Sequence, residues 1–219
     1  MLRSQYTGVE SSRMLDNQYF KKYLTDRNID LSQHIEIEKL CTLDINPKEF
    51  EHFAEIHRNE ATVKWYHPRP FLNAETNTQA INANWIGYNE HNTKETNWGL
   101  DPRHNKLLKE IIGRDNFDRM GLDPDETLLR LLEYMPGHCL PLHYDGFEGF
   151  KRLYGKEDST RFFVAISDWD WGHVLQVHDN MISNWKPGDT YIIPAGVCHA
   201  SANFGISPKY TLTVTGVRK

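Results

Sequence analysis

Three side chains in the C-terminal half have the types and the order of a metal site. His143 and Asp145 are separated by a single residue, and His199 follows after two predicted turns. Two imidazoles and one carboxylate make the facial triad that holds a non-haem Fe(II) and leaves the other side of the octahedron open. Lys209, further along the chain, could hold the carboxylate of a second substrate.

The His-x-Asp tripeptide carries little weight alone. In a chain of 219 residues with 11 histidines, about one such tripeptide is expected by chance. Its flanks are more informative, because residues 127–134 form a largely apolar, strand-like run, and Pro136 and Pro141 exclude a helix after it. Residues i and i+2 of a strand face the same way, so His143 and Asp145 can reach one metal ion.

A second set of turn signals places His199. Residues 185–189 (Trp-Lys-Pro-Gly-Asp) predict a turn that feeds a strand over 190–193. Residues 194–196 (Pro-Ala-Gly) predict another turn, after which the chain enters a strand at His199. A strand start is a rigid position suited to a metal ligand.

In this order, the motifs resemble the Fe(II)/2-oxoglutarate-dependent dioxygenases, in the prolyl-4-hydroxylase-like branch. The resemblance covers about residues 127–217. It rests on Tyr134-Met-Pro-Gly137, Pro141-Leu-His143-Tyr-Asp145, Lys186-Pro-Gly-Asp189, His199, Lys209 and the apolar strand 210–216. The order and spacing of these pieces are specific, although no single piece is.

The resemblance implies that Fe(II) is bound by His143, Asp145 and His199, with no catalytic side chain beyond these ligands. It also implies 2-oxoglutarate and O2 as co-substrates, with ascorbate as an optional reductant. The implied activity is a hydroxylase of a protein residue, prolyl-like, or of a small molecule. Such an enzyme couples C–H oxidation to the decarboxylation of 2-oxoglutarate to succinate.

Lys209 is the residue expected to hold the distal carboxylate of 2-oxoglutarate. Strand alternation puts Lys209, Thr211 and Thr213 on one face, so Thr211 or Thr213 adds a donor, and Tyr134 supplies another nearby. A lysine in an apolar cavity is costly unless an anion completes it. The other interpretation is a surface lysine beside the turn at Ser207-Pro208.

Two departures limit what the resemblance implies. Family members often carry a Gly-Gly-Glu-Thr-like run after the His-x-Asp, whereas residues 166–174 here read Ile-Ser-Asp-Trp-Asp-Trp-Gly-His-Val. The substrate-side wall therefore differs from the family pattern. Nothing before residue 100 matches a family signature, so the primary substrate, a peptide, a protein or a small molecule, is not inherited.

A rival interpretation uses the same residues. The spacing of Gly188, Pro194, Gly196, His199 and Asn203 matches the second cupin motif, and the segment from Gly137 to Asp145 imitates the first. Cupins share the jelly-roll barrel but usually add a third histidine or a glutamate, and they need no basic residue after the last ligand. The alternative is therefore a cupin-type metal-dependent enzyme or ligand-binding module that does not use 2-oxoglutarate.

The predicted fold is mainly β with supporting helices, built on a double-stranded β-helix, that is, a cupin-like jelly roll. A single domain is expected over 1–219, with a helical and strand support region over about 1–125 and the metal-binding core over about 126–219. The short runs rich in β-formers that predict the remaining core strands are Arg161–Ser167, His173–His178, Thr190–Ile193, His199–Phe204 and Tyr210–Val217.

Two helices are predicted in the support region. Asn46-Pro47 opens the first, with Phe50, Phe53, Ala54 and His57 on one face. Asp101-Pro102 opens the second, which has Leu107, Leu108, Ile111 and Ile112 at helical spacing and Gly113 as a left-handed cap. Residues 80–88 are predicted as a strand.

Composition favours a catalyst of a reducing compartment, expected to be cytoplasmic. The three cysteines are odd in number and widely spaced, and no apolar leader or membrane-length run is apparent. A net charge of −5 and a pI near 6.1 give no basic field to collect nucleic acid. Neither a membrane nor a nucleic acid is an expected partner.

The remaining candidates have a structural interpretation beside the functional one. Three further histidines, His138, His173 and His178, are more often hydrogen-bonded or solvent-facing residues than ligands. Alternation points Cys198 away from His199, as a small buried hydrophobe. Trp169 and Trp171 are expected in core or rim packing rather than in a substrate wall. Residues 146–160 form a solvated loop or a lid.

Overall fold

The computed structural model describes residues 35–65, 91–143, 148–156, 159–194 and 197–219. Its helices are α3 (Pro47–Ile56), η1 (Arg58–Glu60), α5 (Pro102–Ile112), α6 (Arg114–Met120), η3 (Pro124–Glu126) and α7 (Glu148–Tyr154). Its strands are β1 (Lys39–Thr42), β2 (Thr62–Trp65), β3 (Lys94–Trp98), β4 (Thr127–Tyr134), β5 (Cys139–His143), β6 (Thr160–Ala165), β7 (His173–Val177), β8 (Asn180–Ile182), β9 (Asp189–Ile193), β10 (His199–Asn203) and β11 (Lys209–Gly216).

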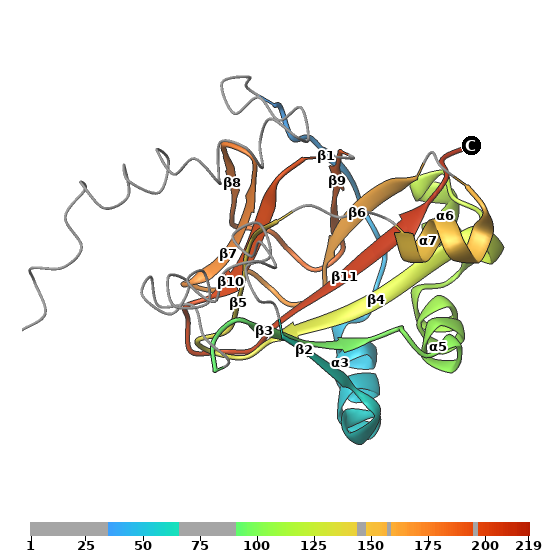
Figure 1. The fold of residues 1–219 in the computed structure, drawn as a ribbon. Coiled ribbons are helices and arrows are strands. Elements are labelled where there is room, and N and C mark those ends of the chain that lie inside the picture. The colour runs from blue at the N-terminus through green and yellow to red at the C-terminus, as the bar shows by residue number, and fades with distance from the viewer. Residues whose placement is uncertain (1–34, 66–90, 144–147, 157–158, 195–196) are drawn as a thin grey trace, which may run out of the picture.

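The strands form two antiparallel sheets whose order is that of a jelly roll. The larger sheet runs β1-β9-β6-β11-β4-β3-β2 and the smaller runs β5-β10-β7-β8. From β4 onward the chain passes repeatedly between the two sheets, so sequential strands wind into a double-stranded β-helix (Figure 1). The predicted fold class is therefore confirmed. Strands β1, β2 and β3, from the support region, extend the larger sheet at both edges.

Alternation along the strands gives the larger sheet two different faces. On the outer face, Leu212 and Val214 of β11 join the helices in one apolar cluster that also contains Phe50, Leu108 and Phe117. Figure 1 shows α3, α5 and α6 grouped on one side of this sheet and the smaller sheet on the other. The inner face carries a second, smaller cluster together with many polar side chains. The helices thus supply the dry core, and the space between the sheets is left for a site.

The two predicted support helices form where their caps indicate. The side chain of Asn46 accepts from the amide of Lys48, and Asp101 does the same for Arg103, so each helix starts at its proline. The buried face of α5 contains Leu108 and Ile112, as predicted. One detail is wrong: Gly113 has φ 76° and ψ 153°, which is a positive-φ break rather than a left-handed cap. The break lets α6 begin immediately in a new direction.

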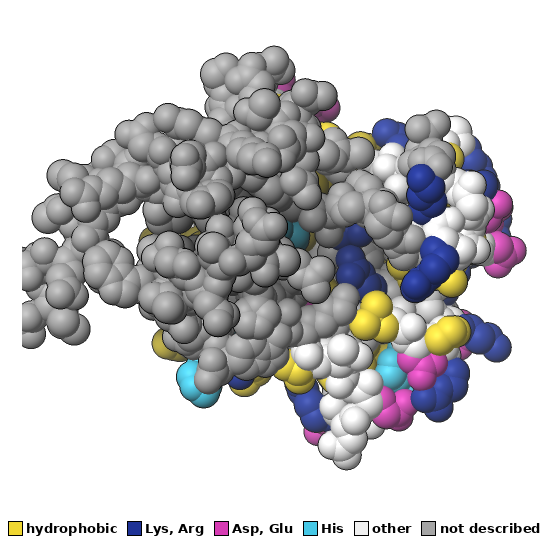
Figure 2. Space-filling view, viewed as in Figure 1, with side chains coloured by type: hydrophobic (Ala, Val, Ile, Leu, Met, Phe, Trp, Pro, Cys, Tyr) yellow, Lys and Arg dark blue, Asp and Glu magenta, His cyan; other side chains and the backbone are white. Residues whose placement is uncertain are grey.

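The interpretation of residues 146–160 as a loop is wrong over its middle. Helix α7 occupies Glu148–Tyr154, because Phe150 is buried and its ring contacts Tyr154 one turn later. The strand predicted over residues 80–88 lies outside the described residues. Among the described residues, no helix is long and apolar enough to span a membrane. On the part of the face in Figure 2 that belongs to described residues, basic side chains are mixed with acidic and apolar ones.

Gly188 offers a test of the turn that feeds β9. Its φ is +87°, and a Cβ there would lie 2.2 Å from the carbonyl oxygen of Leu43. Gly155 also has a positive φ, +66°, but open space around it. We expect Gly155→Ala to lower the free energy of unfolding by about 1 kcal/mol, from backbone strain alone. Gly188→Ala should cost about 3 kcal/mol, because the clash adds to the strain. Equal losses in urea unfolding would contradict this packing of the turn.

Candidate functional site

The rings of His143 and His199 lie side by side. The two residues are direct partners across strands β5 and β10, and their ring centroids are 4.3 Å apart with planes at 55°. Nδ1 of His199 lies 3.1 Å from the carbonyl oxygen of Val197. Both side chains are partly exposed. The structure therefore brings together two of the three predicted metal ligands, and the third, Asp145, lies outside the described residues.

A β-bulge aims His143 into the barrel. The pairing of β5 with β10 shifts between His199 and Ser201, whose partners are His143 and Leu140. Two steps along β10 thus correspond to three along β5. As a result Leu140 and His143, three residues apart, line the same cavity, which simple alternation would forbid. Bulges of this kind are frequent beside active sites because they redirect one side chain.

The two histidines open onto a cavity between the sheets. The described residues that line it are Glu95, Arg130, Leu132, Tyr134, Leu140, His143, Arg161, Phe162, Phe163, Leu175, Ile193, His199, Ser201, Thr211 and Thr213. This set includes the predicted residues Tyr134 and Thr211, which sit on neighbouring strands β4 and β11. The cavity thus combines an imidazole pair, several hydroxyls and charged side chains of both signs.

Lys209 lies next to this cavity, in contact with its lining residue Ser201, and 0% of its surface is exposed. Its ammonium donates to Ser201 Oγ at 2.7 Å and to the carbonyl oxygens of Val174 and Ala202. The rings of Tyr134 and Trp185 are 5.1 and 5.5 Å from Nζ. Burial lowers the pKa of Lys209 to about 7. The surface-lysine interpretation is therefore wrong, although Lys209 is not among the described residues that line the cavity wall.

The predicted alternation along β11 is confirmed. Lys209 contacts the smaller sheet through Val174 and Ser201, and Thr211 and Thr213 line the cavity, so all point inward. Tyr134 is also buried, but its hydroxyl donates to Glu95 Oε2 at 2.9 Å. Its predicted role as a donor to 2-oxoglutarate remains a proposal.

Three charged residues of the cavity were not singled out from the sequence. Glu95 of β3 is 2% exposed, and it accepts from Asn97 Nδ2 as well as from Tyr134. Arg130 of β4 and Arg161 of β6 also line the cavity, and Arg161 Nε donates to Thr215 Oγ1 at 3.2 Å. The sequence feature that could have identified such residues is a charged residue between apolar neighbours on a predicted strand, as in Leu129-Arg130-Leu131.

The remaining sequence candidates have structural roles. Nδ1 of His173 accepts a hydrogen bond from the backbone amide of Asp170, and Nε2 of the same ring lies 3.2 Å from the carbonyl oxygen of Ser207. Cys198 is buried, as predicted. Trp169 packs on the inner cluster and donates to the carbonyl oxygen of His173, as predicted. Core packing is wrong for Trp171, which is 80% exposed and whose ring centroid lies 5.4 Å from that of Trp169. Neither tryptophan is among the cavity-lining residues that the structure describes.

The other two histidines singled out from the sequence, His138 and His178, lie outside the cavity lining as far as it is described. Nδ1 of His178 lies 3.1 Å from a carboxylate oxygen of Asp179. Burial lowers the pKa of His138, and the nearby Lys94 lowers it further. A role for either as an additional ligand therefore has no support in this geometry.

Comparison with known proteins gives partial similarities to cupin-type structures. No family model matches the sequence, and no curated protein matches it. A protein from Thermus thermophilus is 25% identical over 42% of this chain and 74% of its own, with a TM-score of 0.31. A predicted oxalate decarboxylase from Thermotoga maritima is 14% identical over 57% of this chain and 81% of its own, with a TM-score of 0.34.

A third solved structure is a sugar phosphate isomerase from a cupin superfamily, from Silicibacter pomeroyi. It is 18% identical, with a TM-score of 0.33, and the match covers 56% of this chain and 59% of that one. Because these matches are partial, the jelly-roll assignment rests on the strand order of the chain itself.

The burial of Lys209 predicts a pH dependence of stability. The pKa is about 7 in the fold, against 10.5 for a lysine in water, so between these values the unfolded chain binds more protons than the folded one. The penalty for burying the charge is therefore full below pH 7 and disappears as the pH rises toward 10.5. We therefore compare the free energies of unfolding of the wild type and Lys209→Met. As the pH increases above 7, the wild type should gain stability relative to the variant, by at most about 1.4 kcal/mol per pH unit.

Urea unfolding from pH 6 to pH 9 measures this difference. Lys48→Met, which removes an exposed lysine of α3, is the matched control. A flat difference for Lys209→Met across this range would show that the lysine is not buried as described.

Proposed function

We propose that this protein is an Fe(II)- and 2-oxoglutarate-dependent dioxygenase that hydroxylates a protein residue or a small molecule. The observation that carries the proposal is the adjacent pair His143 and His199 on a cavity with both polar and apolar lining residues, with the buried Lys209 next to it. The cavity lies inside a jelly-roll barrel, between its two sheets.

The residues present fit a metal ion. The two imidazoles come from adjacent strands with ring centroids 4.3 Å apart, and both face the cavity. Two histidines and one carboxylate suit iron, and Asp145 is the proposed carboxylate. When bound, iron would supply the chemistry that converts 2-oxoglutarate, O2 and a C–H bond into succinate, CO2 and an alcohol.

The spacing along β10 supports a dicarboxylate between the metal ligands and Lys209. His199 and Ser201 are two residues apart on one strand, about 7 Å, and Ser201 Oγ accepts from the Lys209 ammonium. That separation is comparable with the length of a five-carbon diacid. We assign the distal carboxylate to Lys209, with Thr211 as an added hydroxyl donor on the same strand face. The protein's task is to orient the co-substrate and exclude water from it.

A cupin-type metal-dependent enzyme or ligand-binding module without 2-oxoglutarate is the second candidate. One observation favours it: the ammonium of Lys209 already has three neutral acceptors on the protein. A carboxylate would have to displace at least one of them. The two candidates differ in whether 2-oxoglutarate is bound and consumed.

Succinate formation is the direct test. We expect the purified protein with Fe(II), 2-oxoglutarate and ascorbate to form succinate slowly without a primary substrate. Panels of peptides and amino acids should then reveal the substrate class by stimulation. His143→Ala, Asp145→Ala and His199→Ala should each abolish turnover and weaken Fe(II) binding by at least about tenfold to a hundredfold. His52→Ala, an exposed histidine of α3, is the control and should retain turnover.

A metal-loaded wild type that binds no 2-oxoglutarate would sink the oxygenase proposal in favour of the cupin-type one. Unaltered Fe(II) binding in all three ligand variants would sink both, because both need this metal site.

Lys209→Met should raise the concentration of 2-oxoglutarate required for turnover while leaving Fe(II) binding nearly intact. Removing one member of a buried charged pair costs roughly 2 to 5 kcal/mol, or from about 30-fold to several thousand-fold. Lys209→Arg should recover part of the loss. Arg161→Met is the comparison, since this second buried basic residue itself lines the cavity. If Lys209→Met needs a normal concentration of 2-oxoglutarate for turnover and Arg161→Met needs a raised one, the carboxylate is bound by Arg161 and not by Lys209.

A further inference from the structure

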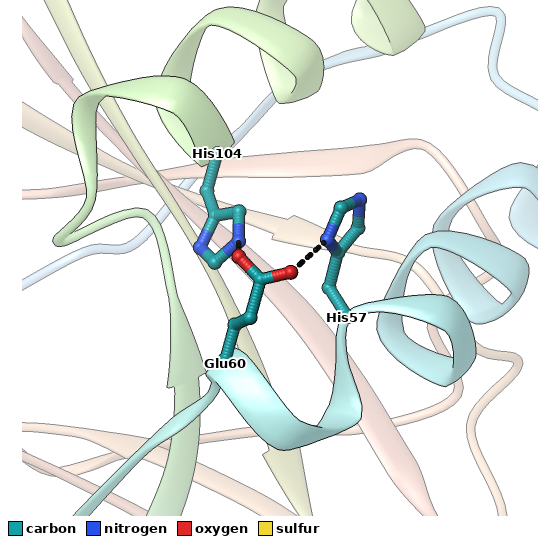
Figure 3. Close-up of side chains that lie close together, drawn as sticks. All are labelled: His57, Glu60 and His104. Carbon is teal, nitrogen blue, oxygen red and sulfur yellow. Dashed lines mark hydrogen bonds and ion pairs between the residues drawn. The ribbon is translucent and has the colours of Figure 1, made fainter.

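A second group of metal-capable side chains lies outside the barrel, in the helical layer. His57 is the residue that ends α3, Glu60 closes η1, and His104 lies in the first turn of α5. One ligand atom from each residue lies within 4.8 Å of the other two. Figure 3 shows both imidazoles directed at the carboxylate of Glu60, which stands between them.

The distances match those between neighbouring ligands of one small ion. His57 Nδ1 is 3.1 Å from Glu60 Oε1, and His104 Nε2 is 3.2 Å from Glu60 Oε2. Ligand atoms at about 2.0 to 2.1 Å from a tetrahedral zinc ion are about 3.3 to 3.4 Å apart. The two distances run to different oxygens of the Glu60 carboxylate, and one donor atom from each of the three residues lies within 4.8 Å of the other two. Side-chain rotation that brings these three atoms closer would place them around one ion.

Packing holds the two imidazoles in position before any ion arrives. His104 is 2% exposed, and the ring of Phe53 contacts both histidines, with centroids 4.7 Å from His57 and 5.6 Å from His104. The indole of Trp98 donates to the carbonyl oxygen of His57 at 2.9 Å. The inner wall of the cluster is thus rigid and apolar. The side chain of Glu60 is 42% exposed, so a solvent ligand can complete the coordination from outside.

The charges leave a carboxylate ready to bind a cation. Glu60 contacts both imidazoles through its two carboxylate oxygens. Arg103 also reaches Glu60, at 3.2 Å, but its side chain is 74% exposed and makes its shorter contact, 2.6 Å, with Asp101. An incoming ion can therefore displace Arg103 from Glu60 without leaving the guanidinium unpaired.

We propose that His57, Glu60 and His104 form a zinc site that fastens the end of α3 and η1 to α5. Two imidazole nitrogens and one carboxylate oxygen are a donor set that suits zinc, whereas magnesium and calcium prefer oxygen ligands alone. The site is separate from the barrel cavity, so it does not depend on the proposed oxygenase activity. Binding would add a link between α5 and the consecutive pair α3 and η1, which residues 61–101 separate from α5 along the chain.

Zinc titration of the metal-free protein tests the proposal. The background for every measurement is His143→Ala/His199→Ala, which removes the barrel imidazoles. We expect this protein to bind one Zn²⁺, and Zn²⁺ to raise its Tm. Adding Glu60→Gln or His57→Ala should weaken binding by at least about tenfold to a hundredfold and remove the Tm shift. The controls are His52→Ala and Glu55→Gln, which change exposed residues of α3. They should neither weaken Zn²⁺ binding nor remove the Tm shift.

Cobalt gives a second readout that does not depend on stability. Co²⁺ in place of Zn²⁺ should give the intense visible bands of a tetrahedral site in the background protein but not after Glu60→Gln. A resident site should be filled at about 100 μM Zn²⁺. Absence of binding at that concentration, or binding unchanged by Glu60→Gln and His57→Ala, would overturn the proposal and leave a hydrogen-bonded clamp only.

Discussion

Charged side chains are buried between the two sheets, and their need for hydrogen-bond partners is the constraint on which the barrel depends. An unpaired charge in an apolar interior is far more costly than a lost hydrogen bond. Lys209 is satisfied by Ser201 and two backbone carbonyls, and Glu95 by Tyr134 and Asn97. Because strand alternation sends apolar residues of the larger sheet to the helical side, the same sheet contributes to the apolar core on one face and to the cavity on the other.

A second buried charge ties the helical layer to the barrel. Burial would raise the pKa of Glu133 on β4, but hydrogen bonds from Arg58 and Tyr210 outweigh it, so the pKa is lowered. Burial together with Glu133 raises the pKa of Tyr210 to about 12. Since Arg58 opens η1, the same short helix carries the charge that pairs with β4 and the carboxylate that meets His57. Movements of η1 are therefore coupled to the central strands of the larger sheet.

Local pattern was sufficient for strands β4 to β7 and β9 to β11 and for the histidine pair, but β1, β2, β3 and β8 were not predicted. Turn residues and period-two alternation are properties of neighbouring positions, so β4 and the start of β10 at His199 were predictable. The bulge that lets Leu140 and His143 share a face was not, because it arises only from pairing with β10. Arg161 and Glu95 reach the cavity through long-range pairing, which no local pattern encodes. Helix α7 was not predicted, because the burial of Phe150 depends on packing against the rest of the fold.

The choice of lysine rather than arginine at position 209 has a consequence for the proposed co-substrate site. Because burial lowers the pKa of Lys209 to about 7, its side chain without a ligand changes between the charged and neutral forms in the neutral pH range. A carboxylate attracts the charged form, so its arrival raises the pKa and draws in a proton. Affinity for the anion then falls by up to about tenfold per pH unit above neutrality. Arginine stays charged and would show no such coupling. Neutral acceptors such as Ser201 hold the amine in place in both states, so binding and proton uptake are linked at one residue.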